Sequence, residues 1–344
     1  MTGNTQMNED DNQMTKPFLP LEVQRGSQSN STTPDHELKK QRAKARAAIL
    51  ALSVFQTAAN LCIKMLHHLP SVQIAFLRSI SMLIIGSTYL FFTKKYTQIS
   101  IVRESPVVSK NLLAYTLYGN CGLMLLTMAV SSLPLAESSV LFFSNAIFNG
   151  INGYFLLGLK YTKFEFGMSM ISLVGVTLIA KPPMLFNTAE TSVEGGEGGE
   201  GGASHFLSAI ICLGSAFSFS IAYMKVRVLP QTLDMLVVIY AFNLVTLIST
   251  SAYALLTGSF VSLSFSDWVL GLICGVFAIT FIYLQNRAYQ IEKPSRVATI
   301  SLGLQLVYST LIDLFVFGHF PDFLSMLGVG AIVGSVYMIL QLKH

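Results

Sequence analysis

Long apolar stretches separated by short polar connections make up most of the chain. A helix needs about 20 predominantly apolar residues to cross the hydrocarbon core of a bilayer, and ten stretches of about this length are present. They run approximately over residues 47–66, 72–92, 111–130, 135–157, 164–180, 205–224, 235–256, 267–286, 297–317 and 323–340. The pattern predicts an all-α integral membrane protein with ten transmembrane helices.

A constant spacing of 160 residues relates matching positions in the two halves of the chain. It joins Pro70 to Pro230 and Gly158 to Gly318. Each half holds five apolar stretches, and because five is odd, the second half must cross the membrane in the opposite sense to the first. We therefore expect two inverted five-helix repeats, an organisation typical of secondary transporters.

Composition supports a membrane protein with little room for a soluble catalytic domain. Hydrophobic residues make up 52% of the chain and charged residues only 12%, and the mean hydropathy is +0.57. The polar start of the chain lacks the apolar surface that would offset the entropy of ordering it. The expected division is a disordered basic tail over 1–46, a first repeat over 47–186, a Glu/Gly-rich linker over 187–204 and a second repeat over 205–344.

The positions of the basic residues predict the orientation. Of the 22 Lys and Arg residues, only Lys64, Arg78 and Lys181 lie outside the segments expected on one side of the membrane. Cytosolic connections of membrane proteins carry an excess of Lys and Arg, so both termini are expected in the cytosol. This asymmetry explains the net charge of +4 without nucleic-acid binding. A plasma-membrane and an endomembrane location both stay open.

Polar side chains midway along the apolar stretches are candidates for a substrate cavity, because they are costly in hydrocarbon. Asn145 and Gln305 are again 160 residues apart, so two carboxamides lie at matching depths. Carboxamides offer donors and acceptors without a fixed charge, which suits a polar or zwitterionic solute. The alternative is that they only hydrogen-bond helices together. The candidate cavity residues are Asn120, Asn145, Asn149, Asn243, Gln305 and Tyr308.

Two charged residues are expected toward the non-cytosolic side of the membrane. Arg78 lies about 9 Å inside its apolar stretch at a rise of 1.5 Å per residue, so it needs a partner. Glu137, near the start of the fourth stretch, is expected on the same side. A structural ion pair and a gate that opens when the pair breaks are both open interpretations.

Residue patterns typical of enzymes are not apparent. The sequence has no phosphate-binding loop, no nucleophile with an adjacent base and no set of metal ligands at a characteristic spacing. We expect no enzymatic activity, no metal and no cofactor, so transport would be facilitated, exchange-driven or ion-coupled. A channel or a non-transporting scaffold with the same fold is the alternative.

Two segments resemble a known family. The run from Leu69-Pro70 to Phe76-Leu77-Arg78 resembles EamA-like domains of the drug/metabolite transporter superfamily, and residues 175–186 (GVTLIAKPPMLF) look like the G subgroup of solute carrier family 35. The resemblance implies transport of a small organic solute by alternating access, in a cavity lined mainly by the first four helices of each repeat. The expected partners are a small-molecule substrate and the lipid bilayer, and a homodimer is left open.

Overall fold

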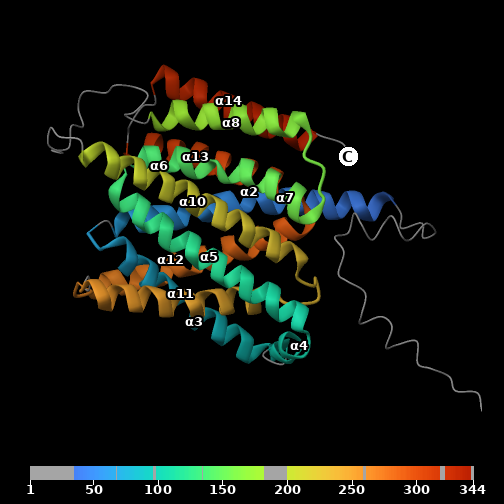
Figure 1. Ribbon diagram of the computed structural model, residues 1–344, viewed down its shortest axis with the longest axis vertical. Helices are drawn as coiled ribbons and strands as arrows, with labels where there is room; N and C mark the ends of the chain where they lie inside the picture. Colours follow the sequence, from blue (N-terminus) through green and yellow to red (C-terminus); the bar gives the residue numbers. More distant parts are fainter. Residues whose placement is uncertain are drawn as a thin grey trace, which may run out of the picture.

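The described part of the chain is a bundle of helices. The computed structural model describes residues 35–66, 68–95, 98–133, 135–181, 200–258, 261–317 and 322–341. The helices are α2 (Asp35–Met65), α3 (Ser71–Phe92), α4 (Gln98–Glu104), α5 (Pro106–Ser132), α6 (Leu135–Phe143), α7 (Asn145–Leu157), α8 (Lys163–Ala180), α10 (Glu200–Val228), α11 (Met235–Thr257), α12 (Phe265–Ile291), α13 (Pro294–Phe317) and α14 (Phe323–Gln341). Figure 1 shows the long helices side by side. The all-α prediction is confirmed.

Within the described residues, nine helical segments are long and apolar enough to cross a membrane. One of them, Glu137–Leu157, combines α6 and α7. The prediction of a multi-pass membrane protein is therefore confirmed. The remaining predicted stretch forms α13, a helix of 24 residues that is not among the nine, so the count of ten crossings and the repeat stay predictions.

Two predicted boundaries fall inside helices. α2 begins at Asp35, inside the tail expected over residues 1–46, and the division into tail, repeats and linker stays a prediction. Residues 35–46 are rich in Lys, Arg, Gln and Ala, which are strong helix formers. Likewise, α10 begins at Glu200, inside the linker expected over residues 187–204. Acidic residues are favourable in the first turn of a helix. The rest of the tail and residues 187–199 of the linker lie outside the described residues.

The fourth predicted span is interrupted halfway. α6 ends at Phe143 and α7 starts at Asn145, with Ser144 between them at φ −55° and ψ −18°, close to the values of a 3₁₀ turn. The amide of Ser144 donates to the carbonyl of Leu141 at 3.1 Å, three residues back instead of four. The carbonyl of Ser144 in turn accepts from the amides of Ile147 and Phe148 at 3.0 and 2.9 Å, so the helix is tightened locally, midway along this span.

The helices pack in a pattern that exchanges the two halves of the chain. In the predicted repeats, α2, α3, α5, α7 and α8 correspond to α10, α11, α12, α13 and α14. The contact of α2 with α12 has its counterpart in α10 with α5, that of α3 with α12 in α11 with α5, and that of α2 with α13 in α10 with α7. The pairs α3 with α11, α7 with α13 and α8 with α14 are their own counterparts. An internal twofold axis would produce such packing.

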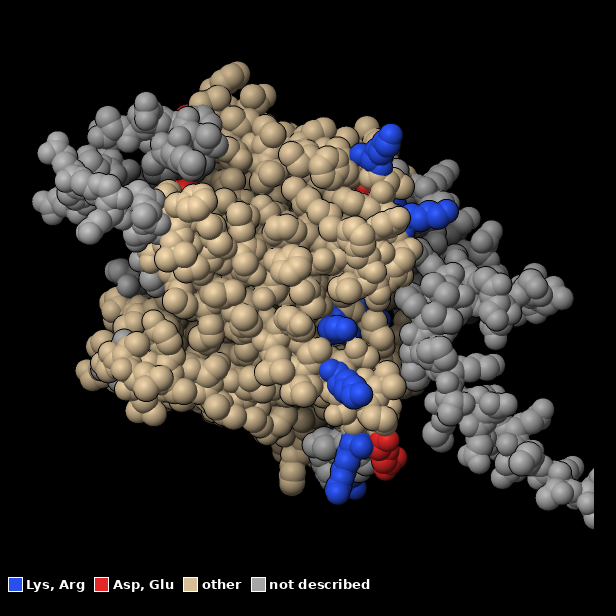
Figure 2. Space-filling model, viewed as in Figure 1, with Lys and Arg blue, Asp and Glu red and all other residues tan. Residues whose placement is uncertain are grey.

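Basic residues gather at one end of the bundle, which we call the basic end. It is the end where α8 and α13 begin and α10 and α12 finish, on the right in Figures 1 and 2. Figure 2 shows the blue side chains there and a broad tan surface elsewhere on this face. The described Lys and Arg of this end are Arg46, Lys94, Lys95, Arg103, Lys110, Lys160, Lys163, Lys225, Arg227, Arg287, Lys293 and Arg296. The cytosolic location of this end stays a prediction.

Glycines allow α8 and α14 to touch backbone to backbone. A Cβ atom on Gly328 would lie 2.6 Å from the carbonyl oxygen of Gly175, and one on Gly175 would lie 2.8 Å from that of Gly328. Gly330, two residues further along α14, has nothing within 4 Å of such an atom. Small residues at a helix contact permit this approach inside a membrane.

The substitution Gly328→Ala is expected to lower the melting temperature of the purified protein in detergent. The added methyl group would force α8 and α14 apart, and overpacking of this kind costs about 1–3 kcal/mol. Gly330→Ala is the matched control and should not lower it, because Ala is favoured over Gly in helices by about 1 kcal/mol. Equal melting temperatures for the two variants would contradict the close contact.

Candidate functional site

Three asparagines on α7 form a buried polar row that faces α10. Asn145, Asn149 and Asn152 are spaced by four and three residues, so they share one helix face, and all three are buried. Asn145 Nδ2 donates to the carbonyl of Ala216 at 2.6 Å, Asn149 Nδ2 donates to Asn145 Oδ1 at 2.9 Å, and Asn152 Nδ2 donates to the Ser220 hydroxyl at 2.9 Å. The row therefore joins the two halves of the chain.

The orientation of these amides leaves one acceptor open. A backbone carbonyl only accepts, so the carbonyl of Ala216 requires the NH₂ group of Asn145, and Asn145 Oδ1 then requires the NH₂ group of Asn149. Asn149 Oδ1 is left buried without a hydrogen-bond partner. An unsatisfied buried acceptor costs about 1–3 kcal/mol. A hydrogen-bond donor that reaches this atom would recover that energy.

A second open acceptor lies on α5. Asn120 Nδ2 donates to the carbonyls of Thr116 and Phe242 at 2.9 and 3.3 Å, which fixes its orientation, and its Oδ1 is buried without a partner. Asn243 instead donates to the carbonyl of Ile239 in its own helix at 2.8 Å. Asn120 thus presents an acceptor to the interior, as Asn149 does.

The other two predicted cavity residues lie on α13 and are half-buried. α13 packs against α7, and Tyr308 contacts the apolar cluster that includes Phe143 and Ala146. Among the described residues, no hydrogen bond joins Asn145 to Gln305, because Asn145 donates to α10. The symmetric pair expected across one cavity therefore stays a prediction.

Several interior polar residues were not identified from the sequence. Asn286 Nδ2 donates to the Tyr115 hydroxyl at 3.2 Å, and the rings of Tyr223 and Tyr289 stack with centroids 4.2 Å apart. The predicted apolar stretch ends at Asn286, which would place that residue at the membrane surface. α12 instead continues for a further turn, to Ile291, so Asn286 is buried. Hydropathy alone does not indicate this extra turn.

A buried ion pair joins the two halves at the basic end. Glu165, at the third position of α8, accepts from Arg296 Nε on α13 at 2.6 Å, with Lys293 Nζ at 3.4 Å from the same oxygen. The side chains of Glu165 and Arg296 are 2% and 8% exposed. Glu165 also forms a capping box with Thr162. Among the described ion pairs, this is the one in which both partners are most deeply buried.

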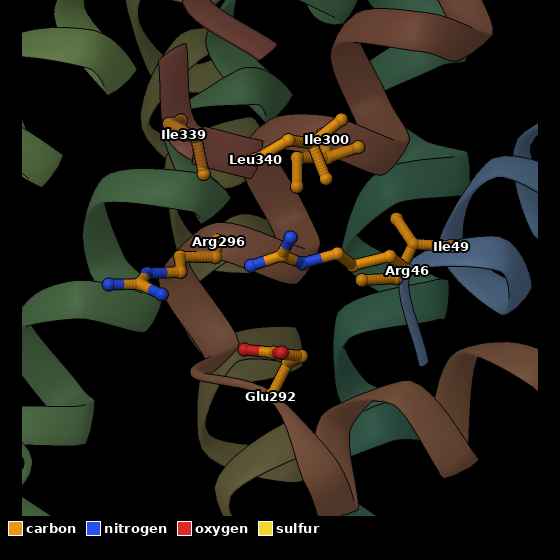
Figure 3. A pocket seen from close by; sticks show the side chains of 7 residues that line it. All are labelled: Arg46, Ile49, Glu292, Arg296, Ile300, Ile339 and Leu340. Atoms are coloured by element: carbon orange, nitrogen blue, oxygen red, sulfur yellow. The ribbon is translucent and has the colours of Figure 1, made fainter. Parts of the chain in front are cut away.

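The space beside this ion pair is narrow. A pocket of about 10 Å³ is lined by Arg46, Ile49, Glu292, Arg296, Ile300, Ile339 and Leu340, a volume that admits about one water molecule. Figure 3 shows Arg46 reaching into the pocket above Glu292, while the guanidinium of Arg296 points away from it. Arg227 supports the same end by donating to the carbonyl of Tyr289 at 2.8 Å.

At the opposite end, two carboxylates lie within hydrogen-bonding distance of histidines. Glu137 pairs with His205 at 3.1 Å, and Asp267 pairs with His68 at 3.2 Å. The histidine side chains are 41% and 50% exposed. Each pair joins the first half of the chain to the second.

The two charged residues predicted for a gate, Arg78 and Glu137, have different surroundings. No ion pair joins Arg78 to Glu137 in the part of the chain that the structure describes. Arg78 lies beside the Cys274 thiol of α12, and its Nε is buried without a hydrogen bond. Their shared role as a gate stays a prediction. No group of three or more His, Cys, Asp or Glu that could hold a metal ion is found in the described ranges.

Comparison with known proteins assigns the architecture to a family. The model of the EamA-like transporter family matches residues 42–181 and again residues 206–341. Solute carrier family 35 member G1 of Homo sapiens is 23% identical over 63% of this chain and 58% of its own length. Probable transport protein YPL264C of Saccharomyces cerevisiae is 23% identical over 61% and 62% of the two chains. The chain thus spans less than two thirds of these relatives.

One solved crystal structure shares the fold. It superposes with a TM-score of 0.65 and covers 87% of this chain and 96% of its own, at 14% sequence identity. At this identity the likeness concerns the arrangement of the helices alone.

Glu165→Gln is expected to loosen the basic end. Arg296 and Lys293 would lose their carboxylate, and breaking a buried ion pair on one side costs about 3–5 kcal/mol. Hydrogen–deuterium exchange should become faster in the first turns of α8 and α13 and stay unchanged in the middle of α10.

Asp322→Asn is the matched control, because it removes a carboxylate from an ion pair with Lys181 in which Asp322 is 51% exposed. It should leave exchange at the basic end unaltered. If Glu165→Gln leaves exchange in α8 and α13 at the wild-type rate, the ion pair does not hold this end closed.

Proposed function

Because this chain belongs to the EamA-like transporter family, we propose that it carries a small organic solute across a membrane by alternating access. The observation that carries the proposal is a set of open hydrogen-bond acceptors inside the bundle, in a chain whose two halves are joined at the basic end by a buried ion pair. A helix bundle that served only as a scaffold would gain stability by pairing these acceptors.

The solute that fits this interior donates hydrogen bonds. Asn149 Oδ1 and Asn120 Oδ1 are both acceptors without partners, and hydroxyl, amide or ammonium groups would satisfy them. We propose a polar neutral or zwitterionic solute at the level of the break at Ser144. Substrate sites of transporters with inverted repeats lie near the bilayer midplane and use interrupted helices in this way.

Movement of the two halves against each other would expose the site to one side at a time. The two separate matches of the family model and the exchange of helix contacts between the halves support two repeats. Glu165 in the first half and Arg296 in the second would act as the gate of the basic end. Glu137 with His205, and His68 with Asp267, would take the corresponding role at the opposite end.

The interruption at Ser144 gives the bundle a place to bend. The backbone hydrogen bond of Ser144 runs to the carbonyl three residues back instead of four, and such a local 3₁₀ turn inside a helix often marks a hinge. α7 carries the asparagine row and packs on both α10 and α13. A change at the site would therefore reach the second half directly. No cofactor or nucleotide is required by this mechanism.

Counterflow in proteoliposomes tests the function. Purified protein would be reconstituted, loaded with a panel of unlabelled amino acids, nucleosides, sugars and amines, and given the same labelled solutes outside. A carrier accumulates label transiently when the same solute is inside, because exchange is faster than net movement. Uptake that no internal solute stimulates would contradict a carrier and favour a channel or a scaffold.

Asn149→Leu is expected to weaken transport of the solute found in this way. Loss of one neutral hydrogen bond costs about 0.5–1.5 kcal/mol, which corresponds to a rise of about 2- to 13-fold in the half-saturating concentration. Thr280→Val is the control, since Thr280 is only partly buried on α12 and its hydroxyl donates to the carbonyl of Val276 in its own helix. Normal transport by Asn149→Leu at wild-type expression would remove Asn149 from the site.

A further inference from the structure

A groove on the side of the bundle lies near the basic end. Its volume is about 580 Å³, and its lining comes from α5, α7 and α10. The lining residues are Val107, Lys110, Asn111, Ala114, Tyr118, Leu156, Ile221 and Lys225. None of these residues belongs to the asparagine row or to the ion pair of Glu165, so the groove is separate from the proposed transport site.

The groove carries two positive charges that no residue in the described part of the chain neutralises. Lys110 and Lys225 have no hydrogen bond or ion pair among the described residues, and no carboxylate lines the groove. Other cations of the basic end are engaged, such as Arg296 and Lys293 by Glu165 and Lys95 by Asp234. An anion therefore has a place here that it lacks at those positions.

Below the lysines, the lining becomes apolar. Tyr118 lies eight residues beyond Lys110 on α5, which is about 12 Å along the helix axis at 1.5 Å per residue. Ala114 and Ile221, each four residues from a lysine toward the middle of its helix, line this part of the groove. Leu156, which is 52% exposed, lines the groove near the end of α7. A cationic rim above an apolar groove in a membrane-spanning bundle matches the two chemical parts of a phospholipid.

The position of the groove also favours a lipid. α5 belongs to the first half and α10 to the second, and these two helices pack against each other. The bundle surface here is the surface that faces the bilayer, and Figure 2 shows it as a mostly uncharged face with Lys and Arg toward the basic end. Lys and Arg near a membrane surface attract anionic lipids with about 1 kcal/mol each.

We propose that this groove binds one anionic phospholipid from the leaflet at the basic end. The phosphate lies between the ammonium groups of Lys110 and Lys225, with Asn111 beside it, and an acyl chain lies along Ala114, Leu156 and Ile221. The lipid would bridge the two halves of the chain. This site is independent of the proposed transport function.

Native mass spectrometry of the full-length protein in detergent tests this site. The protein would be titrated with dioleoylphosphatidylglycerol and, in parallel, with dioleoylphosphatidylcholine. We expect a first phosphatidylglycerol to bind well before any phosphatidylcholine. Lys110→Gln with Lys225→Gln should weaken that first binding about 30-fold, which is the effect of two cations at about 1 kcal/mol each.

Two further variants separate a built site from general attraction to a basic surface. Lys160→Gln with Lys163→Gln removes the same charge from the start of α8 and should change the binding less than twofold. Ala114→Trp fills the groove without altering charge and should weaken the binding as strongly as the loss of both lysines. The melting temperatures without lipid serve to show that all variants are folded.

Several results would overturn the proposal. They are equal losses in the two charge variants, unchanged binding in folded Ala114→Trp protein, and equal affinity for the two lipids. Displacement of phosphatidylglycerol by an equal concentration of glycerol phosphate would also overturn it, because the site would then recognise phosphate without a lipid.

Discussion

Hydrocarbon offers no hydrogen bonds, so each polar group inside this bundle must find a partner within the chain or remain unsatisfied at a cost. Most serine and threonine hydroxyls meet this constraint locally, as Ser79 and Thr246 do by donating to carbonyls one turn back in their own helices. Asn145 meets it across the bundle by donating to Ala216. Asn149 Oδ1 and Asn120 Oδ1 are among the exceptions, together with other buried acceptors such as Gln56 Oε1 and Asn286 Oδ1, and a donor that reached them would satisfy them.

The same constraint separates what hydropathy predicts from what it misses. Apolar length located the helices, and the four- and three-residue spacing of Asn145, Asn149 and Asn152 placed them on one face. Neither apolar length nor residue spacing predicted the interruption at Ser144, because a local change from an i−4 to an i−3 hydrogen bond leaves the composition unchanged. The pairing of Glu165 with Arg296, 131 residues away in sequence, depends on how α8 packs against α13, and a single sequence contains no direct record of that contact.

Burial distinguishes the ion pair of Glu165 with Arg296 from the other described ion pairs. Both of its partners are removed from water, so losing one of them is expensive. Lys95 beside Asp234 at the same end, and His205 and His68 beside Glu137 and Asp267 at the opposite end, keep contact with water, which weakens electrostatic attraction. The proposed lipid between α5 and α10 would add a further contact between the halves at the basic end.

Alternate opening of the two ends would change distances between spin labels placed at each end. One pair of labels would sit at Lys163 on α8 and Ile291 on α12, at the basic end, and another at Met65 on α2 and Leu256 on α11, at the opposite end, in a cysteine-free background. All four positions are exposed. On introducing Glu165→Gln, the account predicts that the first distance lengthens while the second shortens. Two distances that stay fixed, or change in the same sense, would contradict it.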